Sequence, residues 1–470
     1  MRLRPPLPAA PFLVLLILAS AACEEGIARP GGDTVAGVSV DPPSKELTVS
    51  DQFQFDAIVR NALGLRLPGL GVTWTSSDTS VVSVTSSGLA HAVGEGTATL
   101  AATLEGVSGS SVVTVLAPPL PVWPQHTCAR AGTAQAWCWG RGIGGELGMG
   151  DRFGGAAPRL LPLSDGVVSI TTGAGHSCAV TGDGTARCWG RGSEGQLGNA
   201  TSRSVLSPVP VDHDDAWAQL TAGGRHTCGL DADGVLRCWG WNGFGQLGNG
   251  TTVNLSTPVI IESPLRFSDV SAGGNHTCAV ALDGSVWCWG DNRNGQLGDG
   301  TRTDALLPVR AQSQSTYVDV EAGTRHTCAI KDDGMADCWG ANDRAQLGDG
   351  SLTDHLIPSR VSLNVRYEAL ALGAAHTCGL GRGRRLWCWG EGASGQLGDG
   401  ASVLRGNPTQ LEGDYISVSA GAAHTCGVRV SLEAFCWGAG AQGQLGTGDY
   451  EGRPVPTPVA GGVQFVQVGS

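Results

Sequence analysis

Fourteen of the 15 cysteines in this chain of 470 residues form seven pairs that recur with a nearly constant period. The members of each pair are ten residues apart, and successive pairs follow after 50 residues, or 48 for the last. The pairs are Cys128 with Cys138, Cys178 with Cys188, Cys228 with Cys238, Cys278 with Cys288, Cys328 with Cys338, Cys378 with Cys388, and Cys426 with Cys436. A repeat of this length marks a supersecondary unit that cannot bury its apolar faces alone, so the units must stack or close into a ring.

Residues 1–22 have the pattern of a secretory signal peptide. Arg2 and Arg4 precede an apolar stretch, Phe12–Ala19, that is too short for a stable membrane span. The small residues before Cys23 resemble the bacterial lipoprotein cleavage box, which implies that Cys23 becomes the lipidated first residue. Ordinary signal-peptidase cleavage stays open because that pattern usually has Leu where Ser20 stands. The one cysteine left over from seven pairs favours lipidation.

The charge and hydropathy of the chain restrict its partners. The formal net charge is −12, which argues against electrostatic binding to DNA, RNA or anionic lipid. Beyond the leader no apolar run is long enough to span a bilayer, so the lipid is the only membrane attachment expected. We therefore expect an exported protein: an outer-membrane or cell-surface lipoprotein, or a periplasmic or secreted protein.

Residues 36–116, after a small, polar and Gly-rich tether (23–35), have the pattern of a β-sandwich. About seven short apolar alternations are separated by turn residues. The phrases at 72–78, 87–89 and 96–100 resemble the bacterial immunoglobulin-like group 2 family, which implies that Trp74 is the buried core tryptophan. Such modules act as spacers or adhesive units, and we favour a spacer. Residues 117–121 (Ala-Pro-Pro-Leu-Pro) predict a stiff linker.

Residues 122–470 contain the repeat, and its fourth copy shows the pattern. Alternating residues from Phe267, the stretch His-Thr-Cys-Ala-Val from His276, Val-Trp-Cys-Trp from Val286 and the Pro-Val after Leu307 predict four strands, with a hairpin turn at Asp283-Gly284. Four short antiparallel strands per unit make a propeller blade. The elements Gly-x-x-His, Trp-Gly and Gly-Gln-Leu-Gly resemble the regulator-of-chromosome-condensation repeat family, which implies an all-β, seven-bladed β-propeller.

The two ends of the repeat array predict ring closure. The first copy begins at Gln125-His126 without the strand that precedes the histidine elsewhere, whereas the chain ends with the strand pattern of 464–468. Pairing of this tail with the hairpin at 126–140 would complete the first blade and remove exposed sheet edges.

Each cysteine pair predicts a disulfide within its blade. Cys178 and Cys188 are symmetric about Asp183 in the hairpin turn, so an antiparallel register places them opposite each other on adjacent strands. Binding of metal by the fourteen thiols is the rival interpretation. The Cys-x2-Cys spacing of metal ligands is absent, and exported proteins meet an oxidising compartment.

The histidine and tryptophan of each repeat are interpreted as structural. The histidines stand two residues before the first cysteine, and neighbouring copies are a full blade apart, so we expect hydrogen bonding rather than a metal or proton site. They are His126, His176, His226, His276, His326, His376 and His424. The tryptophans that follow the second cysteine are expected to pack between blades: Trp139, Trp189, Trp239, Trp289, Trp339, Trp389 and Trp437.

Variation among the copies locates a candidate binding face. The four residues between Trp-Gly and Gly-Gln-Leu-Gly differ in every copy, as does the residue before each histidine, and both positions fall in loops at the same end of a blade. The candidate partner-binding residues are Arg225, Trp241, Phe244, Arg293, Arg325 and Arg344, with the two aromatic side chains as anchors in exposed loops. The alternative is that these loops are solvated and tolerant of change.

The sequence favours a binding protein over an enzyme. Nucleophile-elbow, zinc-protease, phosphate-loop and calcium-loop motifs are missing, and we expect no catalytic residue, cofactor or metal. Members of the resembled family serve as exchange factors for a nuclear GTPase, which an exported chain would not meet, and secreted bacterial propellers of similar type bind a β-lactamase. Our leading hypothesis is a monomeric, lipid-anchored propeller on an immunoglobulin-like stalk that binds an unknown extracellular or envelope protein. The alternatives are an extracellular hydrolase or polysaccharide-active enzyme at the propeller mouth, or a purely structural envelope protein.

Overall fold

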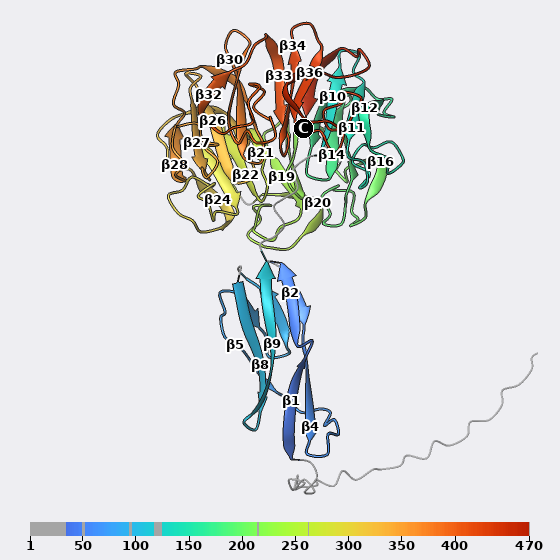
Figure 1. The fold of residues 1–470 in the computed structure, drawn as a ribbon, viewed down its shortest axis with the longest axis vertical. Helices are drawn as coiled ribbons and strands as arrows, with labels where there is room; N and C mark the ends of the chain where they lie inside the picture. Colours follow the sequence, from blue (N-terminus) through green and yellow to red (C-terminus); the bar gives the residue numbers. More distant parts are fainter. Residues whose placement is uncertain are drawn as a thin grey trace, which may run out of the picture. The chain divides into compact units, whose positions relative to one another are not determined.

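The computed structural model describes residues 34–48, 52–93, 96–116, 125–213, 216–261 and 263–469. These residues form β-strands and no helix, so none of them lies in a helix with the length and hydrophobicity that a membrane crossing needs. The chain divides after Pro118 into two compact units (Figure 1). The predicted leader (1–22), the predicted lipidation site Cys23 and the predicted linker (117–121) lie outside the described residues.

The N-terminal unit is an immunoglobulin-like β-sandwich. Its described strands are β1 (Val35–Asp41), β2 (Ser44–Thr48), β3 (Gln52–Gln54), β4 (Asp56–Asn61), β5 (Thr73–Ser76), β6 (Val82–Val84), β7 (Leu89–Ala92), β8 (Gly96–Leu104) and β9 (Val107–Leu116). They form a four-stranded sheet in the order β2-β9-β8-β5, a three-stranded sheet β3-β7-β6 and the pair β1-β4. The sequence pattern missed β4 and β7, and β1 begins at the end of the predicted tether.

The core of this unit differs from the sequence prediction at Trp74. Its side chain on β5 is only half-buried, so the prediction of a buried core tryptophan is wrong. Its fully buried residues include Phe55, Val82, Leu100 and Val113, none of them more than 1% exposed. Along β8, the buried residues Ala98, Leu100 and Ala102 alternate with less buried ones, which is the pattern that fills a sandwich interior.

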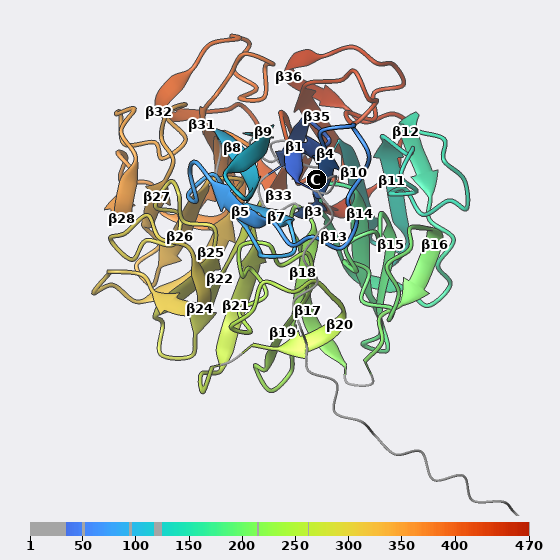
Figure 2. The same ribbon diagram turned by 90° about the horizontal axis from the view of Figure 1, so that it is seen from below.

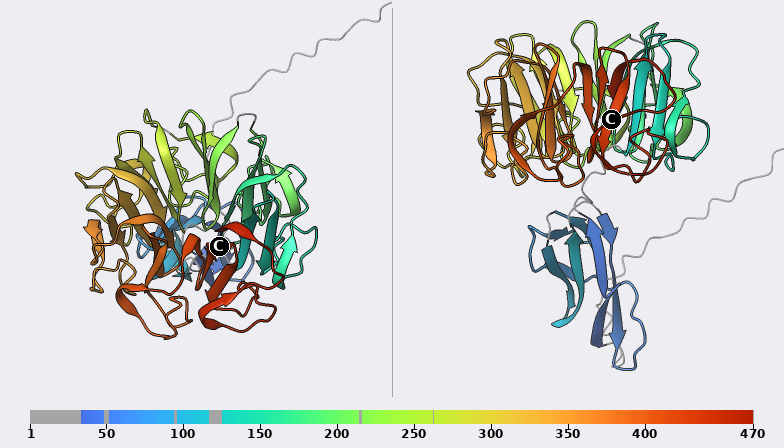
Figure 3. Two further views of the ribbon diagram at one scale, coloured as in Figure 1. Left: turned by 90° about the horizontal axis from the view of Figure 1, so that it is seen from above. Right: turned by 45° about the horizontal axis from the view of Figure 1, so that its top comes forward.

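The C-terminal unit is a propeller of seven four-stranded antiparallel sheets arranged around a central channel (Figures 2 and 3). From first to fourth strand, the blades are β37 (Phe465–Gly469), β10 (His126–Ala131), β11 (Ala136–Gly140), β12 (Gly155–Leu160); β13 (Val167–Thr172), β14 (His176–Thr181), β15 (Ala186–Gly190), β16 (Val205–Pro210); β17 (Trp217–Ala222), β18 (His226–Asp231), β19 (Leu236–Gly240), β20 (Leu255–Ile260); β21 (Phe267–Ala272), β22 (His276–Ala281), β23 (Val286–Gly290), β24 (Ala305–Arg310); β25 (Tyr317–Ala322), β26 (His326–Lys331), β27 (Ala336–Gly340), β28 (His355–Arg360); β29 (Tyr367–Leu372), β30 (His376–Gly381), β31 (Arg385–Gly390), β32 (Arg405–Gln410); and β33 (Tyr415–Ala420), β34 (His424–Arg429), β35 (Ala434–Gly438), β36 (Arg453–Pro458).

Local sequence explains the hairpin at the centre of each blade. In the fourth blade the Asp283 carboxylate accepts a hydrogen bond from the Ser285 N–H (2.9 Å), and Gly284 has a φ of +79°, which favours glycine. This turn fixes the register that places Cys278 opposite Cys288 on β22 and β23.

The seven predicted cysteine pairs are all disulfide-bonded in the structure. Each bridge joins the second and third strands of one blade, its two Cα atoms are 4.1 Å apart, and both of its cysteines are fully buried. The bridges are Cys128 to Cys138, Cys178 to Cys188, Cys228 to Cys238, Cys278 to Cys288, Cys328 to Cys338, Cys378 to Cys388, and Cys426 to Cys436. No bridge among the described residues connects two different blades.

The last strand of the chain belongs to the first blade. β37 pairs with β10 in antiparallel register, with Ala129 opposite Val468 and Ala131 opposite Phe465. Phe465 and Val468 are buried in one cluster with Trp139 of the first blade and Val428 of the seventh. The C-terminal strand therefore joins the two ends of the array and leaves β10 paired on both sides.

Candidate functional site

The two variable loops of each blade meet at one end of the propeller. In the third blade the Trp241 N–H donates to the carbonyl oxygen of Arg225 at 2.9 Å, which connects the loop after β19 with the loop before β18. The fifth blade repeats this bond between the Ala341 N–H and the Arg325 carbonyl at 2.8 Å. We call this set of loops, residues 141–144, 191–194, 241–244, 291–294, 341–344, 391–394 and 439–442 with the residue before each repeat histidine, the rim.

Four of the six candidate partner-binding residues form a continuous cluster on the rim. The Arg225 guanidinium lies 5.5 Å from the centre of the Trp241 ring, which packs edge-on against Phe244 at 5.4 Å. Arg293 of the next blade lies 4.9 Å from the centre of the Phe244 ring. Cation–π contacts of this kind contribute roughly 0.5–1 kcal/mol at exposed sites, so the cluster holds Trp241 in a defined orientation.

Phe244 is not the exposed anchor that the sequence predicted. Its side chain is only 6% exposed, whereas Trp241 is half-buried. Its ring packs against Trp241 and against Arg293 of the next blade. The turn that follows does not by itself bury this position, because the Ser394 N–H makes the same hydrogen bond to the Gln396 side chain and Ser394 is exposed. Of these two aromatic residues, Trp241 is therefore the one that remains available to a partner.

The other two candidates, Arg325 and Arg344, lie apart from the aromatic cluster and form ion pairs. Arg325 bonds Asp343 at 3.1 Å, and Arg344 lies 3.3 Å from Glu391 of the next blade. Their partners are partly exposed, so these ion pairs are worth little to stability. On the fifth and sixth blades the rim therefore carries paired positive and negative charges rather than unpaired arginines.

The repeat histidines connect neighbouring blades through hydrogen bonds, as the sequence predicted. His226 Nε2 lies 2.9 Å from the hydroxyl of Thr277 in the next blade, and His424 Nε2 lies 3.0 Å from Thr127, which closes the ring. The Thr277 hydroxyl donates onward to the backbone carbonyl of Gln246 at 2.9 Å. Because that hydroxyl has only one proton, His226 must donate from Nε2, and its ring is the neutral Nε2-protonated form.

Burial keeps these histidines neutral. It lowers the pKa of His226 and His424 to about 3 and that of His276 to about 4. Each repeat tryptophan is fully buried and donates Nε1 to the backbone carbonyl at the Gln position of the preceding blade, for example Trp289 to Gln246 at 2.9 Å. The histidine and the tryptophan of each repeat thus hydrogen-bond neighbouring blades to each other, and we call these residues and their bonds the clasp. The prediction that both residues are structural is confirmed.

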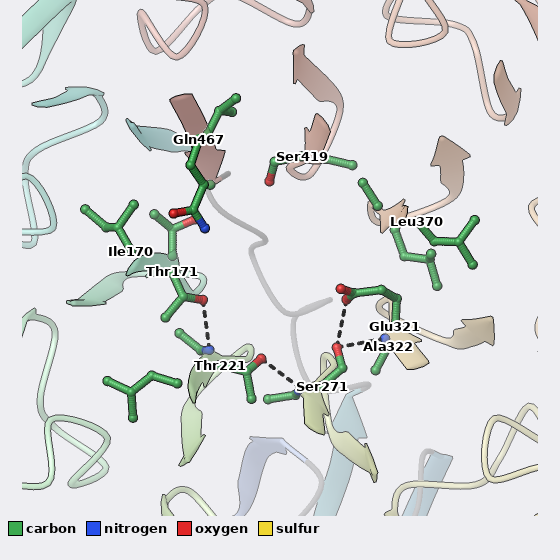
Figure 4. Close-up of a pocket in the computed structure, with 18 of the residues that line it drawn as sticks. Ile170, Thr171, Thr221, Ser271, Glu321, Ala322, Leu370, Ser419 and Gln467 are labelled. Atoms are coloured by element: carbon green, nitrogen blue, oxygen red, sulfur yellow. Dashed lines mark hydrogen bonds between the residues drawn. The ribbon is translucent and has the colours of Figure 1, made fainter. Parts of the chain in front are cut away.

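The central channel contains a cavity of about 270 Å³ lined by the first strand of each blade (Figure 4). Its hydroxyl side chains bond the backbone of the next blade: Thr171 accepts from the Ala222 N–H at 3.2 Å, and Thr221 accepts from the Ala272 N–H at 3.1 Å. Ser271 continues the series by accepting from the Ala322 N–H at 3.0 Å. These hydrogen bonds join the first strand of one blade to the first strand of the next.

Glu321 replaces the hydroxyl residue of this series in the fifth blade, and it is near two further carboxyl groups, those of Asp269 and Asp319. Asp269 accepts hydrogen bonds from Gln219 and from the Val320 N–H, both at 2.9 Å. Glu321 accepts one from the Ser271 hydroxyl at 2.9 Å (Figure 4). Burial raises the pKa of Asp319 and of Glu321, and the neighbouring carboxylates raise both further. Sequence reasoning missed this cluster, although an acid at a position that holds Thr or Ser in most other copies was an available signal. Among the described residues, no group of three His, Cys, Asp or Glu side chains has the arrangement of a metal site.

Glu321→Gln is expected to stabilise the propeller, and more so at alkaline than at mildly acidic pH. A carboxyl group whose pKa is raised by folding binds its proton more tightly in the folded state, so stability is lost as the pH rises from about 4.5 toward the raised folded pKa. Gln removes the charge and still offers an oxygen to Ser271. We expect a gain in Tm of about 2–4 °C near pH 8.5 and a smaller gain near pH 6, measured by calorimetry. The exposed Glu412→Gln is the control and should change neither value; an equal or lower Tm for Glu321→Gln at pH 8.5 contradicts the prediction.

The fold and rim define a disulfide-bonded, seven-bladed propeller preceded by an immunoglobulin-like domain. The chain belongs to the RCC1-like domain family, whose sequence model matches residues 125–470, and residues 34–115 match the bacterial Ig-like domain (group 2). A comparison with curated protein sequences gave no match.

Solved propellers share the fold at low sequence identity. Human WBSCR16 is 20% identical over 70% of this chain and 94% of its own, with a TM-score of 0.64. Yeast RCC1 (Prp20), in a structure with Kap60, is 22% identical over 73% of this chain and 85% of the matched chain, with a TM-score of 0.63. Prp20p from Saccharomyces cerevisiae is 24% identical over 69% of this chain and 86% of the matched chain, with a TM-score of 0.62. At these identities the likeness shows the fold alone.

Proposed function

We propose that this chain is an exported protein-binding propeller whose rim recognises another protein, with the immunoglobulin-like domain as a spacer. The supporting observation is that the structure separates a repeated interior from a varied surface. The clasp residues and disulfides recur in every blade, whereas the rim differs in each copy and gathers Arg225, Trp241, Phe244 and Arg293 into one cluster. Loops that vary on a rigid scaffold are where proteins of this architecture carry recognition residues.

Two further observations support this proposal. Seven buried disulfides suit a chain that folds in an oxidising compartment, and the leader pattern at 1–22 and Cys23 fits export with lipid attachment. Protein binding also occurs on this fold: yeast Prp20 was crystallised with Kap60, and the binding of Prp20p to Gsp1p and histones has been characterised. Those partners belong to the yeast protein. For this chain we propose a non-catalytic role toward an extracellular or envelope protein.

The test is capture of envelope and secreted proteins by the purified mature chain. Trp241→Ala removes the available aromatic residue, and loss of such an anchor typically costs about 2 kcal/mol or more of binding free energy, so we expect capture to fall at least about tenfold. The matched control is Leu282→Ala. Leu282 is 70% exposed and lies in the β22–β23 hairpin, at the other end of the blade from the rim. Equal capture by wild type and Trp241→Ala, with both folded, would refute recognition through this cluster.

A further inference from the structure

A cavity of about 340 Å³ lies on the rim where loops of the first three blades converge. Four arginines line it: Arg141 from the first blade's variable loop, Arg152 farther along the same connection, Arg191 from the second blade and Arg225 from the third. Among the described residues that line the cavity, Glu146 is the one with a carboxylate. This concentration of guanidinium groups contrasts with the net charge of −12 of the whole chain.

Two of these arginines bond neutral oxygens rather than carboxylates. Arg152 donates to the backbone carbonyl of Ile143 at 3.1 Å, and Arg191 donates to the hydroxyl of Ser193 at 3.1 Å. Both side chains are exposed, and a guanidinium has five N–H donors in a fixed fork, so each keeps donors for a further anion. On the fifth and sixth blades, by contrast, the rim arginines bond carboxylates.

Glu146 is the exception to a rule that the other six blades follow. It occupies the position that is Gln in every other copy, as in Gln196. Its side chain is 1% exposed; Oε1 lies 3.4 Å from Arg141 Nε, and Oε2 has no hydrogen-bond partner in the described part of the chain. Burial raises the pKa of this carboxyl, and backbone hydrogen bonding and the guanidinium groups of Arg141 and Arg152 counteract that increase. The buried carboxylate thus holds Arg141 at the cavity wall and neutralises only part of the positive charge.

Exposed apolar residues accompany these arginines in the first blade. Ile143 lines the cavity and is 62% exposed, and Phe153, next in sequence to the lining residue Arg152, is 75% exposed. Arginines beside exposed aliphatic and aromatic groups match a protein segment that carries acids next to apolar residues. A long polyanion such as a nucleic acid fits less well, because the rest of this acidic chain would repel it.

We propose that this cavity binds carboxylate side chains of an acidic, apolar-flanked segment of the partner protein. The inference deepens the proposed function, on which it rests, by assigning the partner's chemistry. Arg152 and Arg191 supply the paired N–H donors, while Arg225 belongs to both the cavity and the Trp241 cluster, so that one partner can contact both features.

The test uses a defined probe, so that it does not depend on finding the partner. A fluorescein-labelled peptide in which Glu pairs alternate with Leu is titrated into the full mature protein, and its counterpart with Gln in place of Glu serves as the reference. We expect the Glu peptide alone to bind, with affinity that falls as salt rises. Arg152→Gln combined with Arg191→Gln should weaken binding at least about tenfold. The control combines Arg266→Gln with Arg310→Gln, exposed arginines near the opposite end of the blades, and should change nothing.

The variant Glu146→Gln provides a second test, because Gln is the residue that the other six blades have at this position. Removing the competing carboxylate frees Arg141, so binding of the Glu peptide should tighten by about threefold or more. Unchanged or weaker binding by this variant, equal binding of the Gln peptide, or no loss in the double arginine variant would overturn the proposal. Displacement of the peptide by millimolar inorganic phosphate but not by acetate would identify a phosphate site instead and also overturn it. Failure of the peptide test with intact Trp241-dependent capture would reject this cavity and leave the proposed function standing.

Discussion

Deletion of residues 463–470 is expected to prevent the propeller from accumulating as a soluble monomer. The deletion removes β37, exposes the edge of β10 and uncovers the cluster that contains Trp139 and Val428. Loss of a buried Phe side chain alone costs about 3–5 kcal/mol, and Phe465 is 1% exposed, so loss of the whole strand approaches the total stability of an ordinary domain. An unpaired edge on β10 also offers a template for aggregation.

Soluble yield, size-exclusion elution and Tm of the purified chain measure this effect. Phe465→Ala gives a graded version that should still fold, with a Tm several degrees lower. The control is a circular permutant that moves residues 463–470 in front of Gln125, with a short connection like the one that joins the first and second strands of the other blades. We expect it to fold, because it restores the same pairing of β37 with β10. A truncated chain that elutes as a monomer and melts like wild type would show that β37 does not close the ring.

Acidification is expected to unfold the propeller cooperatively, well above the pH at which exposed carboxylates alone would do so. The seven repeat histidines have pKa values lowered by burial to about 3 or about 4, against 6.5 when exposed. Between those limits the unfolded chain binds protons that the folded chain cannot, so the histidine contribution to stability is complete above about pH 6.5 and is lost as the pH falls toward 4. Each proton that binds to the unfolded chain but not to the folded chain changes the free energy of unfolding by about 1.4 kcal/mol per pH unit.

Urea unfolding of the non-reduced protein at a series of pH values measures the number of protons taken up. We expect a decrease in the free energy of unfolding between about pH 6.5 and pH 5. Asp304, Asp319 and Glu321 partly offset it, because burial raises the pKa of each carboxyl, to about 6 for Asp304 and about 8 for Asp319. The variant His326→Gln removes one of the buried imidazoles and should lower the proton uptake on unfolding by about one. A free energy of unfolding that stays constant over this range would contradict neutral, buried histidines.

The candidate site was only partly predictable from sequence. Comparison of the copies located the rim correctly, because a position that varies among otherwise equal repeats is under no shared packing constraint. It could not show that Phe244 packs inward and Trp241 does not, since both precede the same Gly-Gln-Leu-Gly turn. Nor could it show that Arg325 and Arg344 form ion pairs with acidic residues, because the partner of a long, flexible side chain depends on which charged groups the fold places near it.

The amino-acid sequence alone determined the number of blades, the register of each central hairpin and the assignment of the final strand to the first blade. The first two follow from local rules, because strand alternation, turn residues and the constant spacing of the cysteines act within about fifty residues. The third follows from the two ends of the array, since the first copy lacks the strand whose pattern ends the chain. Tertiary structure decided which particular side chains of different blades meet. The clasp from His226 to Thr277, the carboxyl groups beside Ser271 and the cavity that the arginines of three blades share each join residues of different repeats. Their chemistry exists only once closure of the ring has set which blades are neighbours and how deeply each side chain is buried.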